Sequence, residues 1–366
     1  MTGFLLREND EPKIRVPQDQ SAHTTLGRLG HGNNRLAIAS IIVTLGLTFS
    51  AFPAAAKASY SPLPSHEDGH GLIAATNRLD PSGSANQIIT LWPDGSHLRV
   101  LTPATDNDRE PDSSPDGKWI AFTRCVGNVN CDEFGAVNIW LMRVDGSDLH
   151  EITNCDGSNC YGSDTPTFSP DGRWIAIDRD QLDQSGVNHQ GIFLIRPDGS
   201  GLRRGTENGA DNPPDLHPHF SPDGDSLVFD REQPDGTRHI MTVRTDGTHL
   251  NTLFEGKDGY APNWSPVSNT LVTALLTKDS TGAGSYNIAT ERADGTHEKQ
   301  LTIQPSGVSS AVRPEFSPNG HQIAYITRDK VGCTLWIMNA NGSGKHLVPI
   351  NDGCTGHPSW VWVRSH

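Results

Sequence analysis

The sequence has few basic residues for its length, and it lacks two motifs that would indicate a serine hydrolase or a zinc site. Its 366 residues include 29 Lys and Arg against 43 Asp and Glu, a formal net charge of −14 at pH 7. An acidic chain repels phosphate backbones, which argues against binding to nucleic acid. No G-x-S-x-G nucleophile motif and no closely spaced C-x2-C pair occurs. We therefore expect no resident cofactor or metal ion in the preferred function given below.

Glycine and proline are abundant instead. The chain has 37 Gly and 25 Pro, about 17% of its residues, against about 12% in average proteins. Both residues break helix interiors, so the excess argues against a helical bundle. It stays below the roughly 25–30% that is typical of low-complexity disorder. With 34% hydrophobic residues the chain can still form a sizeable core.

The N-terminal region has the features of an export leader. Residues 36–52 are uncharged and apolar, Arg28 and Arg35 precede them, and small residues follow. This order is typical of a signal peptide, but about 17 residues is also the lower limit for a membrane-spanning helix. We expect an exported chain, in the periplasm, at the cell surface or secreted, and residues 36–52 could also anchor it in the membrane. The predicted segments are an N-terminal tail (1–35), a signal peptide or signal anchor (36–58), a linker (59–71) and a folded domain (72–366).

One turn motif recurs along the chain. Phe-Ser-Pro-Asp-Gly occurs at 168–172 and 220–224, and degenerate copies occur at 113–117, 264–266 and 316–320. Pro fixes φ, Asp caps the turn and Gly takes positive φ, so the motif predicts a tight turn. A short apolar stretch follows each of the five copies. A further proline stands two residues before each copy, and a sixth such start occurs near the C-terminus; these prolines are Pro111, Pro166, Pro218, Pro262, Pro314 and Pro358.

A second motif also occurs six times. It is an apolar strand that ends in Asp-Gly or Asn-Gly, the strongest short-range signal for a β-hairpin. The copies end at Gly95, Gly146, Gly199, Gly247, Gly295 and Gly342. Two separate motifs that agree on six copies predict six units, each with four antiparallel strands A to D.

Such units are typical of the blades of a β-propeller. We therefore predict an all-β fold, a six-bladed β-propeller of four-stranded antiparallel blades. The apolar stretch at 72–76 lacks a strand A before it, whereas 357–363 has the sequence of a strand A with nothing after it. Pairing of these N- and C-terminal strands would close the ring and remove its open edges.

The motifs resemble the repeats of the TolB-like, WD40-like β-propeller family, with its pattern P-x-[WF]-S-P-D-G followed by x-I-A-F and D-G. The resemblance covers about residues 72–362 and implies the propeller fold. It does not extend to the additional α/β domain that precedes the propeller in genuine TolB, because the first 71 residues contain only the features of a leader and a linker.

The strand order predicts which face carries function. Both kinds of tight turn lie on one face of the propeller, which we call the turn side. The longer B–C and D–A loops lie on the opposite face, which we call the loop side. Binding residues are more common on such loops. Residues that enter each strand A should surround the channel mouth on the loop side and bind a ligand there. These candidates are Arg109, Glu110, Asp164, His217, His219, Tyr260, Arg313, Glu315 and His357.

All six cysteines map to the loop side, and an even number beyond an export leader predicts disulfide bonds. Cys333 precedes strand C of the sixth unit and Cys354 follows its strand D, so we pair them. The other four allow three connectivities, among which local pairing is favoured. They are Cys125, Cys131, Cys155 and Cys160.

The preferred function is a non-catalytic module that binds a protein, peptide or glycan at the cell envelope through its loop side. The alternative is an enzyme, a metal-assisted lyase or hydrolase, with His217, His219, His357 and Glu110 at the channel mouth. A third hypothesis is a sensor domain whose leader stays as an anchor. Propeller folds carry both binding and catalytic functions, so the fold does not decide among them. The sequence does not indicate an oligomeric state.

Overall fold

The computed structural model describes residues 71–78, 85–125, 137–158, 160–182, 188–206, 214–350 and 354–361. The predicted tail and leader lie outside these ranges, as does Cys131. The regular structure in the described ranges is all β-strand. None of it is a helix that could cross a membrane.

Three of the sheets each come from one continuous stretch of chain and have four antiparallel strands. The first contains β12 (Asp215–Phe220), β13 (Ser226–Glu232), β14 (Arg238–Arg244) and β15 (Asn251–Leu253). The second contains β16 (Gly259–Trp264), β17 (Thr270–Lys278), β18 (Gly284–Arg292) and β19 (Lys299–Gln300). The third contains β20 (Ser310–Phe316), β21 (Gln322–Arg328), β22 (Cys333–Asn339) and β23 (His346–Leu347).

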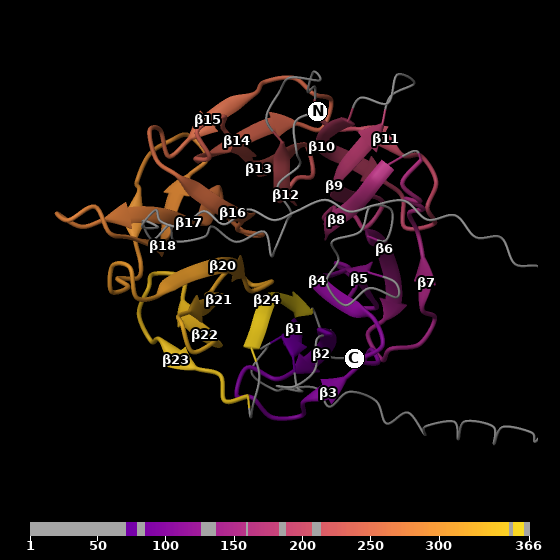
Figure 1. The fold of residues 1–366 in the computed structure, drawn as a ribbon, viewed down its shortest axis with the longest axis horizontal. Helices are drawn as coiled ribbons and strands as arrows, with labels where there is room; N and C mark the ends of the chain where they lie inside the picture. The colour runs from indigo at the N-terminus through magenta and orange to yellow at the C-terminus, as the bar shows by residue number, and fades with distance from the viewer. Residues whose placement is uncertain are drawn as a thin grey trace, which may run out of the picture. The chain divides into compact units, whose positions relative to one another are not determined.

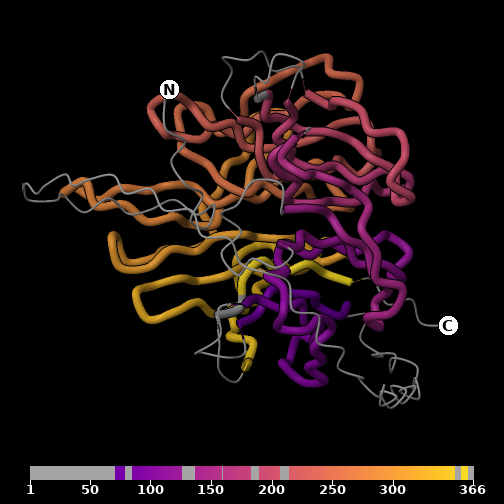
Figure 2. Tube along the Cα trace, turned by 45° about the vertical axis from the view of Figure 1, so that its right-hand side comes forward, coloured from indigo at the N-terminus to yellow at the C-terminus, as the bar shows by residue number. Residues whose placement is uncertain are grey.

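A further four-stranded sheet combines strands from the two ends of the described chain. Here β24 (Cys354–Val361) pairs antiparallel with β1 (Leu72–Arg78), and β2 (Gln87–Leu91) and β3 (Arg99–Val100) follow. The predicted pairing of the first and last strands therefore occurs. Figure 2 shows the indigo first strands beside the yellow last strand.

The remaining eight strands form one larger sheet. Its first half contains β4 (Asn107–Ser113), β5 (Trp119–Cys125), β6 (Val137–Arg143) and β7 (His150–Glu151). Its second half contains β8 (Cys160–Phe168), β9 (Ile175–Leu182), β10 (Asn188–Ile195) and β11 (Arg203–Arg204). The two halves meet through a single parallel residue pair, Val137 with Gly162.

These sheets form an all-β propeller with four-stranded antiparallel blades (Figure 1). The strands nearest the centre, which we call the inner strands, are β4, β8, β12, β16, β20 and β24. Each except β24 runs from a loop on the loop side to a Ser-Pro turn on the turn side. The predicted turns form: the carbonyl of Ser169 accepts a hydrogen bond from the Gly172 N–H at 2.8 Å, and Gly172 has a φ of 68°.

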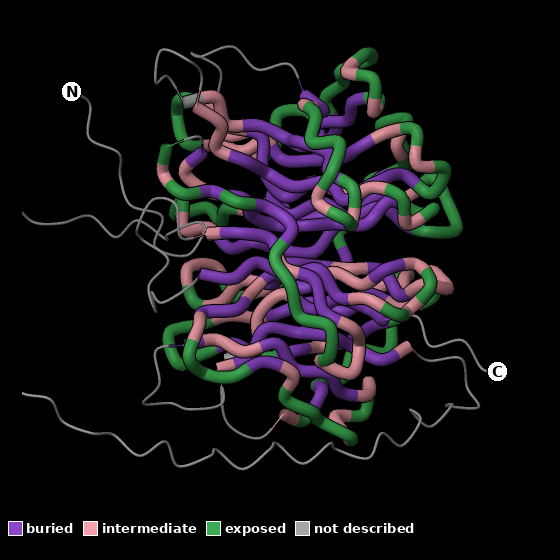
Figure 3. Tube along the Cα trace, turned by 90° about the vertical axis from the view of Figure 1, so that its right-hand side faces the viewer, coloured by how far each residue is buried: buried purple, intermediate pink, exposed green. Residues whose placement is uncertain are grey.

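The core lies between neighbouring sheets. Figure 3 shows buried segments through the strand centres and exposed segments mainly at the turns and loops. In β5, for example, Ile120, Ala121 and Phe122 have no exposed surface. Both faces of such a strand are covered by adjacent sheets, which explains why these stretches are continuously apolar rather than alternating.

The packing of Gly259 gives a test of this core. An added Cβ at Gly259 would lie 2.7 Å from Ile240 Cγ1 and 3.2 Å from Leu275 Cδ2. We expect Gly259→Ala to lower the free energy of unfolding by about 1–3 kcal/mol, the usual cost of overpacking a core, as measured by chemical denaturation. Gly332→Ala is the control, because nothing lies within 4 Å of its added Cβ. Equal losses in the two variants would contradict close packing at β16.

Candidate functional site

The residue before each repeat proline has a positive φ angle, from 31° at His357 to 54° at Glu110 and Arg313. A residue before proline ordinarily prefers extended backbone, so the sequence did not predict this conformation. The strand pairing shifts register at the same point. In β4, for example, Arg109 pairs with Thr123 and Asp112 with Ala121, which is a β-bulge. We call the six residues the proline ring: Glu110, Thr165, His217, Ala261, Arg313 and His357.

Three members of the proline ring form a buried ionic cluster. Arg313 Nη1 and His357 Nδ1 each lie 2.5 Å from Glu110 Oε2. Burial alone would raise the pKa of Glu110, but the positive charge of Arg313 and the contact with His357 outweigh it and hold that pKa far below its usual value. Burial lowers the pKa of His357 in spite of Glu110. At neutral pH the cluster is therefore an Arg–Glu ion pair beside a neutral imidazole.

His217 lies on the same ring and contacts Asp230 and Tyr260. Its Nδ1 is 2.8 Å from Asp230 Oδ1, whereas its Nε2 has no hydrogen-bond partner among the described residues. The rings of His217 and Tyr260 meet edge-on at 4.8 Å, and the guanidinium of Arg313 lies 5.2 Å from the Tyr260 centroid. The axial cavity at this level has a volume of only about 40 Å³, which is close to the size of one water molecule. This volume is well below that of typical ligand sites.

Arg109 and Asp164 form a second ion pair between neighbouring inner strands. Arg109 Nη2 lies 2.6 Å from Asp164 Oδ2, and Thr123 donates to Asp164 Oδ1 at 2.7 Å. The structure therefore brings seven of the nine predicted site residues together, on the proline ring or beside it. They are Arg109, Glu110, Asp164, His217, Tyr260, Arg313 and His357.

The other two predicted residues, His219 and Glu315, line the small axial cavity together with His217, Arg313 and His357, and they also reach a second cavity. Each follows a repeat proline along its strand, so it lies nearer to the turn side than to the predicted mouth. Together with Asp112 and Asn263 they line a second axial cavity of about 270 Å³, the turn-side cavity. Its wall also contains the aromatic residues Phe168, Phe220, Trp264, Phe316 and Trp360 and the turn prolines Pro115, Pro170, Pro222, Pro266 and Pro318.

The polar residues of the turn-side cavity also join neighbouring sheets. Each accepts a hydrogen bond from the backbone N–H of an aromatic residue on the next inner strand. The pairs are Asp112 with Phe168 at 2.7 Å, His219 with Trp264 at 3.2 Å, Asn263 with Phe316 at 3.1 Å and Glu315 with Trp360 at 3.1 Å. Burial lowers the pKa of His219 to about 4, and a neutral imidazole is able to accept such a bond.

Asp112 and Glu315 have strongly perturbed pKa values. Burial raises the pKa of Asp112 to about 7, against the hydrogen bonds from Phe168 and Ser359. Burial and the nearby Asp112 charge raise the pKa of Glu315 well above its usual value. The two carboxyl groups therefore do not both ionise readily at neutral pH.

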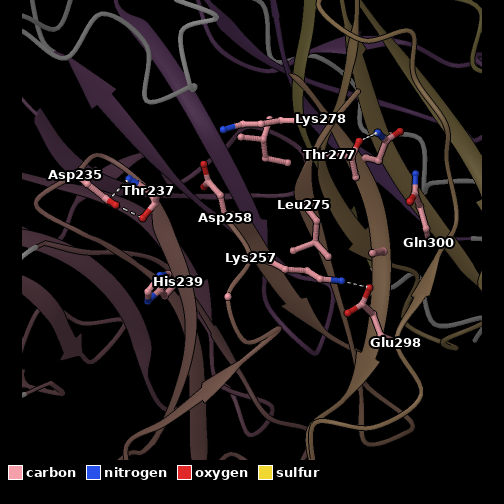
Figure 4. Close-up of a pocket in the computed structure, with 14 residues that line it drawn as sticks. Asp235, Thr237, His239, Lys257, Asp258, Leu275, Thr277, Lys278, Glu298 and Gln300 are labelled. Carbon is pink, nitrogen blue, oxygen red and sulfur yellow. Dashed lines mark hydrogen bonds and ion pairs between the residues drawn. The ribbon is translucent and has the colours of Figure 1, made fainter. Parts of the chain in front are cut away.

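A larger cleft opens on the loop side between the sheet of β12–β15 and the sheet of β16–β19. This loop-side cleft has a volume of about 510 Å³, and Figure 4 shows its lining. Its donors and acceptors come from the β13–β14 loop, the start of β14, the β15–β16 loop, the end of β17, the β18–β19 turn and β19. They include Asp235, His239, Lys257, Asp258, Lys278, Glu298 and Gln300. The sequence did not predict this site, although the basic residue Lys278 ends β17.

The described residues include no group of three His, Cys, Asp or Glu side chains that could hold a metal ion. Cys155 and Cys160 form a disulfide bond, which confirms local pairing for these two. Cys125 is also part of a disulfide bond, and so is Cys333. Cys131 and the side chain of Cys354 lie outside the described part of the chain, so the pairing of Cys333 with Cys354 stays a prediction.

The sequence model of the TolB beta propeller domain matches residues 133–364. The chain belongs to the TolB β-propeller family. The family resemblance inferred from the repeats is thereby confirmed.

Two curated relatives match part of the chain. The uncharacterized protein Atu1656 of Agrobacterium fabrum is 34% identical over 164 residues, which are 42% of this chain and 50% of that protein. The uncharacterized peptidase YuxL of Bacillus subtilis is 30% identical over 152 residues, which are 33% of this chain and 21% of that protein. The matched region thus spans half or less of these relatives.

Solved structures share the fold. TolB from Acinetobacter baumannii has a TM-score of 0.61 at 22% identity, covering 80% of this chain and 66% of that one. The putative TolB from Agrobacterium tumefaciens has a TM-score of 0.58 at 19% identity, covering 78% and 91%. At these identities the similarity shows the propeller fold and does not extend to a shared activity.

The ionic cluster predicts a large effect of one neutralising substitution. Glu110→Gln removes the anion that faces the buried Arg313, so we expect the free energy of unfolding to fall by about 3 kcal/mol. Glu298→Gln is the control, because the ion pair of Glu298 with Lys257 is 37% and 41% exposed and should contribute about 0–1 kcal/mol. Denaturant unfolding at pH 7 measures both. Similar losses would show that the cluster does not contribute to stability.

The acid pair predicts a pH dependence. A carboxyl whose pKa is raised in the folded state stabilises it fully below the unfolded pKa of about 4, and this contribution is lost as the pH rises through the folded pKa of about 7. Between pH 4.5 and 8 the wild type should therefore lose about 1–3 kcal/mol more unfolding free energy than D112N/E315Q. Parallel pH profiles for the two proteins would contradict the raised pKa values.

Proposed function

We propose that this chain is an exported, non-catalytic binding module that holds a protein, peptide or glycan partner on the loop side of its propeller. The observation that carries the proposal is the loop-side cleft. Its volume of about 510 Å³ lies within the roughly 300–1,000 Å³ of typical ligand sites. The proline ring, in contrast, encloses space for little more than water.

The chemistry of the cleft suits a partner rich in hydrogen-bonding groups. Lys257 pairs with Glu298 across it, and Figure 4 shows the two side chains pointing toward one another. Lys278 makes no ion pair within the described residues and lines the same cleft. Both donors and acceptors are therefore available, as recognition of a peptide backbone or of sugar hydroxyls requires.

Exposed aliphatic side chains on the same side support a polypeptide partner. Ile303, after β19, is 88% exposed, and Val331, between β21 and β22, is 96% exposed. They are the two most exposed large hydrophobic residues in the described ranges. Removing such groups from water favours association.

Export is supported by the disulfide chemistry. The Cys155–Cys160 bond is of a kind that persists in oxidising compartments and is rare in the reducing cytosol. The proposal therefore includes the leader at 36–58, as a signal peptide or as an anchor through 36–52.

We propose that the propeller has six blades. The eight-stranded sheet counts as two, because only the pair Val137–Gly162 joins its halves. In the composite blade, β24 and β1 are paired from Leu72–Val361 to Arg78–Cys354. Such a closed ring gives a rigid base for the loops, which suits a binding module.

A charge reversal in the cleft tests the proposed function. We expect Lys278→Glu to reduce chemical crosslinking of the exported chain to its envelope partner at least five-fold, as measured by the yield of the crosslinked species. Arg173→Glu is the matched control, because it makes the same change in charge at an 82% exposed side chain on the turn side. Equal yields from both variants, or no crosslinked partner with the wild type, would overturn the loop-side assignment.

A further inference from the structure

The turn-side cavity contains two carboxyl groups that lack a cationic partner among the described residues. Its lining includes Asp112 and Glu315 but no Lys or Arg. Four buried acids of the inner strands are, in contrast, each paired with a basic side chain. These pairs are Asp108 with Arg124, Glu110 with Arg313, Asp164 with Arg109 and Asp215 with Arg231. Since charged side chains withdrawn from water are normally paired, Asp112 and Glu315, which are partly buried, are exceptions that need an explanation.

The two carboxyl groups lie close enough to act on one ligand. Ser359 Oγ donates to Asp112 Oδ1 at 3.3 Å, and Asp112 and Glu315 line the same cavity. Each acid uses one oxygen to accept a backbone N–H, from Phe168 or Trp360. A carboxylate has about four acceptor positions, so both acids keep lone pairs for a further donor. Their mutual repulsion and burial, which raise both pKa values, would be relieved by a positive charge between them.

The wall of the cavity suits an organic cation better than a metal ion. Aromatic side chains stabilise ammonium and guanidinium groups within about 6 Å of the ring centroid, and five aromatic residues with five prolines form this wall. Apolar walls of this kind also pack against an aliphatic stem. The described residues, in contrast, contain no three-ligand metal group.

The wall also has a hydrogen-bond donor without an acceptor. Trp264 is 6% exposed, and its Nε1 has no hydrogen-bond partner among the described residues. The repeat-equivalent Trp360 donates its Nε1–H to the Glu315 carbonyl at 3.3 Å. An unsatisfied buried donor costs about 1–3 kcal/mol, so a ligand that carries a carbonyl oxygen near its cationic group would satisfy Trp264.

We propose that the turn-side cavity binds an organic cation, a primary ammonium or guanidinium group on an aliphatic stem. The cation lies between Asp112 and Glu315, and the stem lies against the aromatic and proline wall. It belongs to a small amine or to a Lys or Arg side chain of a polypeptide. This site is separate from the loop-side cleft, so it does not depend on the function proposed above.

Titration of the exported chain at pH 8 tests the proposal. The probes are agmatine, N-acetyl-arginine amide and the neutral, size-matched N-acetyl-citrulline amide, followed by tryptophan fluorescence and calorimetry. We expect saturable binding of a cationic probe, with at least ten-fold weaker binding of the citrulline compound. Affinity should fall at least ten-fold in D112N, in E315Q and in the double variant, each shown to be folded by circular dichroism. Asp116→Asn, in the adjacent turn and 47% exposed at the side chain, should bind as the wild type does.

The two sources of the cation are distinguished by Trp264→Phe. If this variant weakens N-acetyl-arginine amide more than agmatine, the carbonyl is recognised and the source is a polypeptide; equal effects indicate a small amine. The proposal is overturned if neither cation binds saturably, if the citrulline compound binds equally well, or if the carboxyl variants bind as the wild type does. Saturation by calcium chloride without any binding of the amines would also overturn it.

Discussion

The β-bulge at each repeat proline is the constraint on which the rest of this structure depends. It places the residue before the proline in a left-handed conformation, which costs energy for any residue other than glycine. Repeating the bulge around the axis brings Glu110, Arg313 and His357 together, although Glu110 and Arg313 are 203 residues apart in sequence. The same bulge directs the residue after the proline to the other axial cavity as well. The residues after the prolines thus line both axial cavities, whereas His217, Arg313 and His357 of the proline ring line only the smaller one.

The acidic side chains at the proline ring and at the turn-side cavity have different partners, and their pKa values shift in opposite directions. At the proline ring, each acid faces an Arg or His, and the pKa of Glu110 is held far below its usual value. At the turn-side cavity, Asp112 and Glu315 face each other and Ser359, and their pKa values rise. The first arrangement stabilises the contact between inner strands near the axis. The second stores an unfavourable interaction, and such sites in proteins are commonly functional.

The outer surface adds a third environment. The loop-side cleft is larger than either axial cavity, and both polar and apolar side chains line it. It forms where two sheets diverge, so its residues come from several loops rather than from one motif. Binding on this side and cation recognition on the turn side would use opposite faces of one rigid scaffold.

The sequence by itself determined the local structure, because turn chemistry is local. Pro and Gly in Ser-Pro-Asp-Gly and Asp-Gly set their own φ angles, so the turns, the strand order and the family could be predicted before any tertiary contact was known. The pairing of 72–76 with the C-terminal strand also followed from counting repeats. The sequence also identified the residues that enter the inner strands, from Arg109 to His357.

Only the tertiary structure decided which of those residues line which axial cavity. His219 and Glu315 seemed equivalent to His217 and Arg313, yet they also line the turn-side cavity, which His217 and Arg313 do not. The bulge could not be predicted, because a residue before proline normally avoids the left-handed region. The loop-side cleft could not be predicted either, because its lining is spread from Asp235 to Gln300 with no shared motif. Long-range packing, which no local rule describes, sets both features.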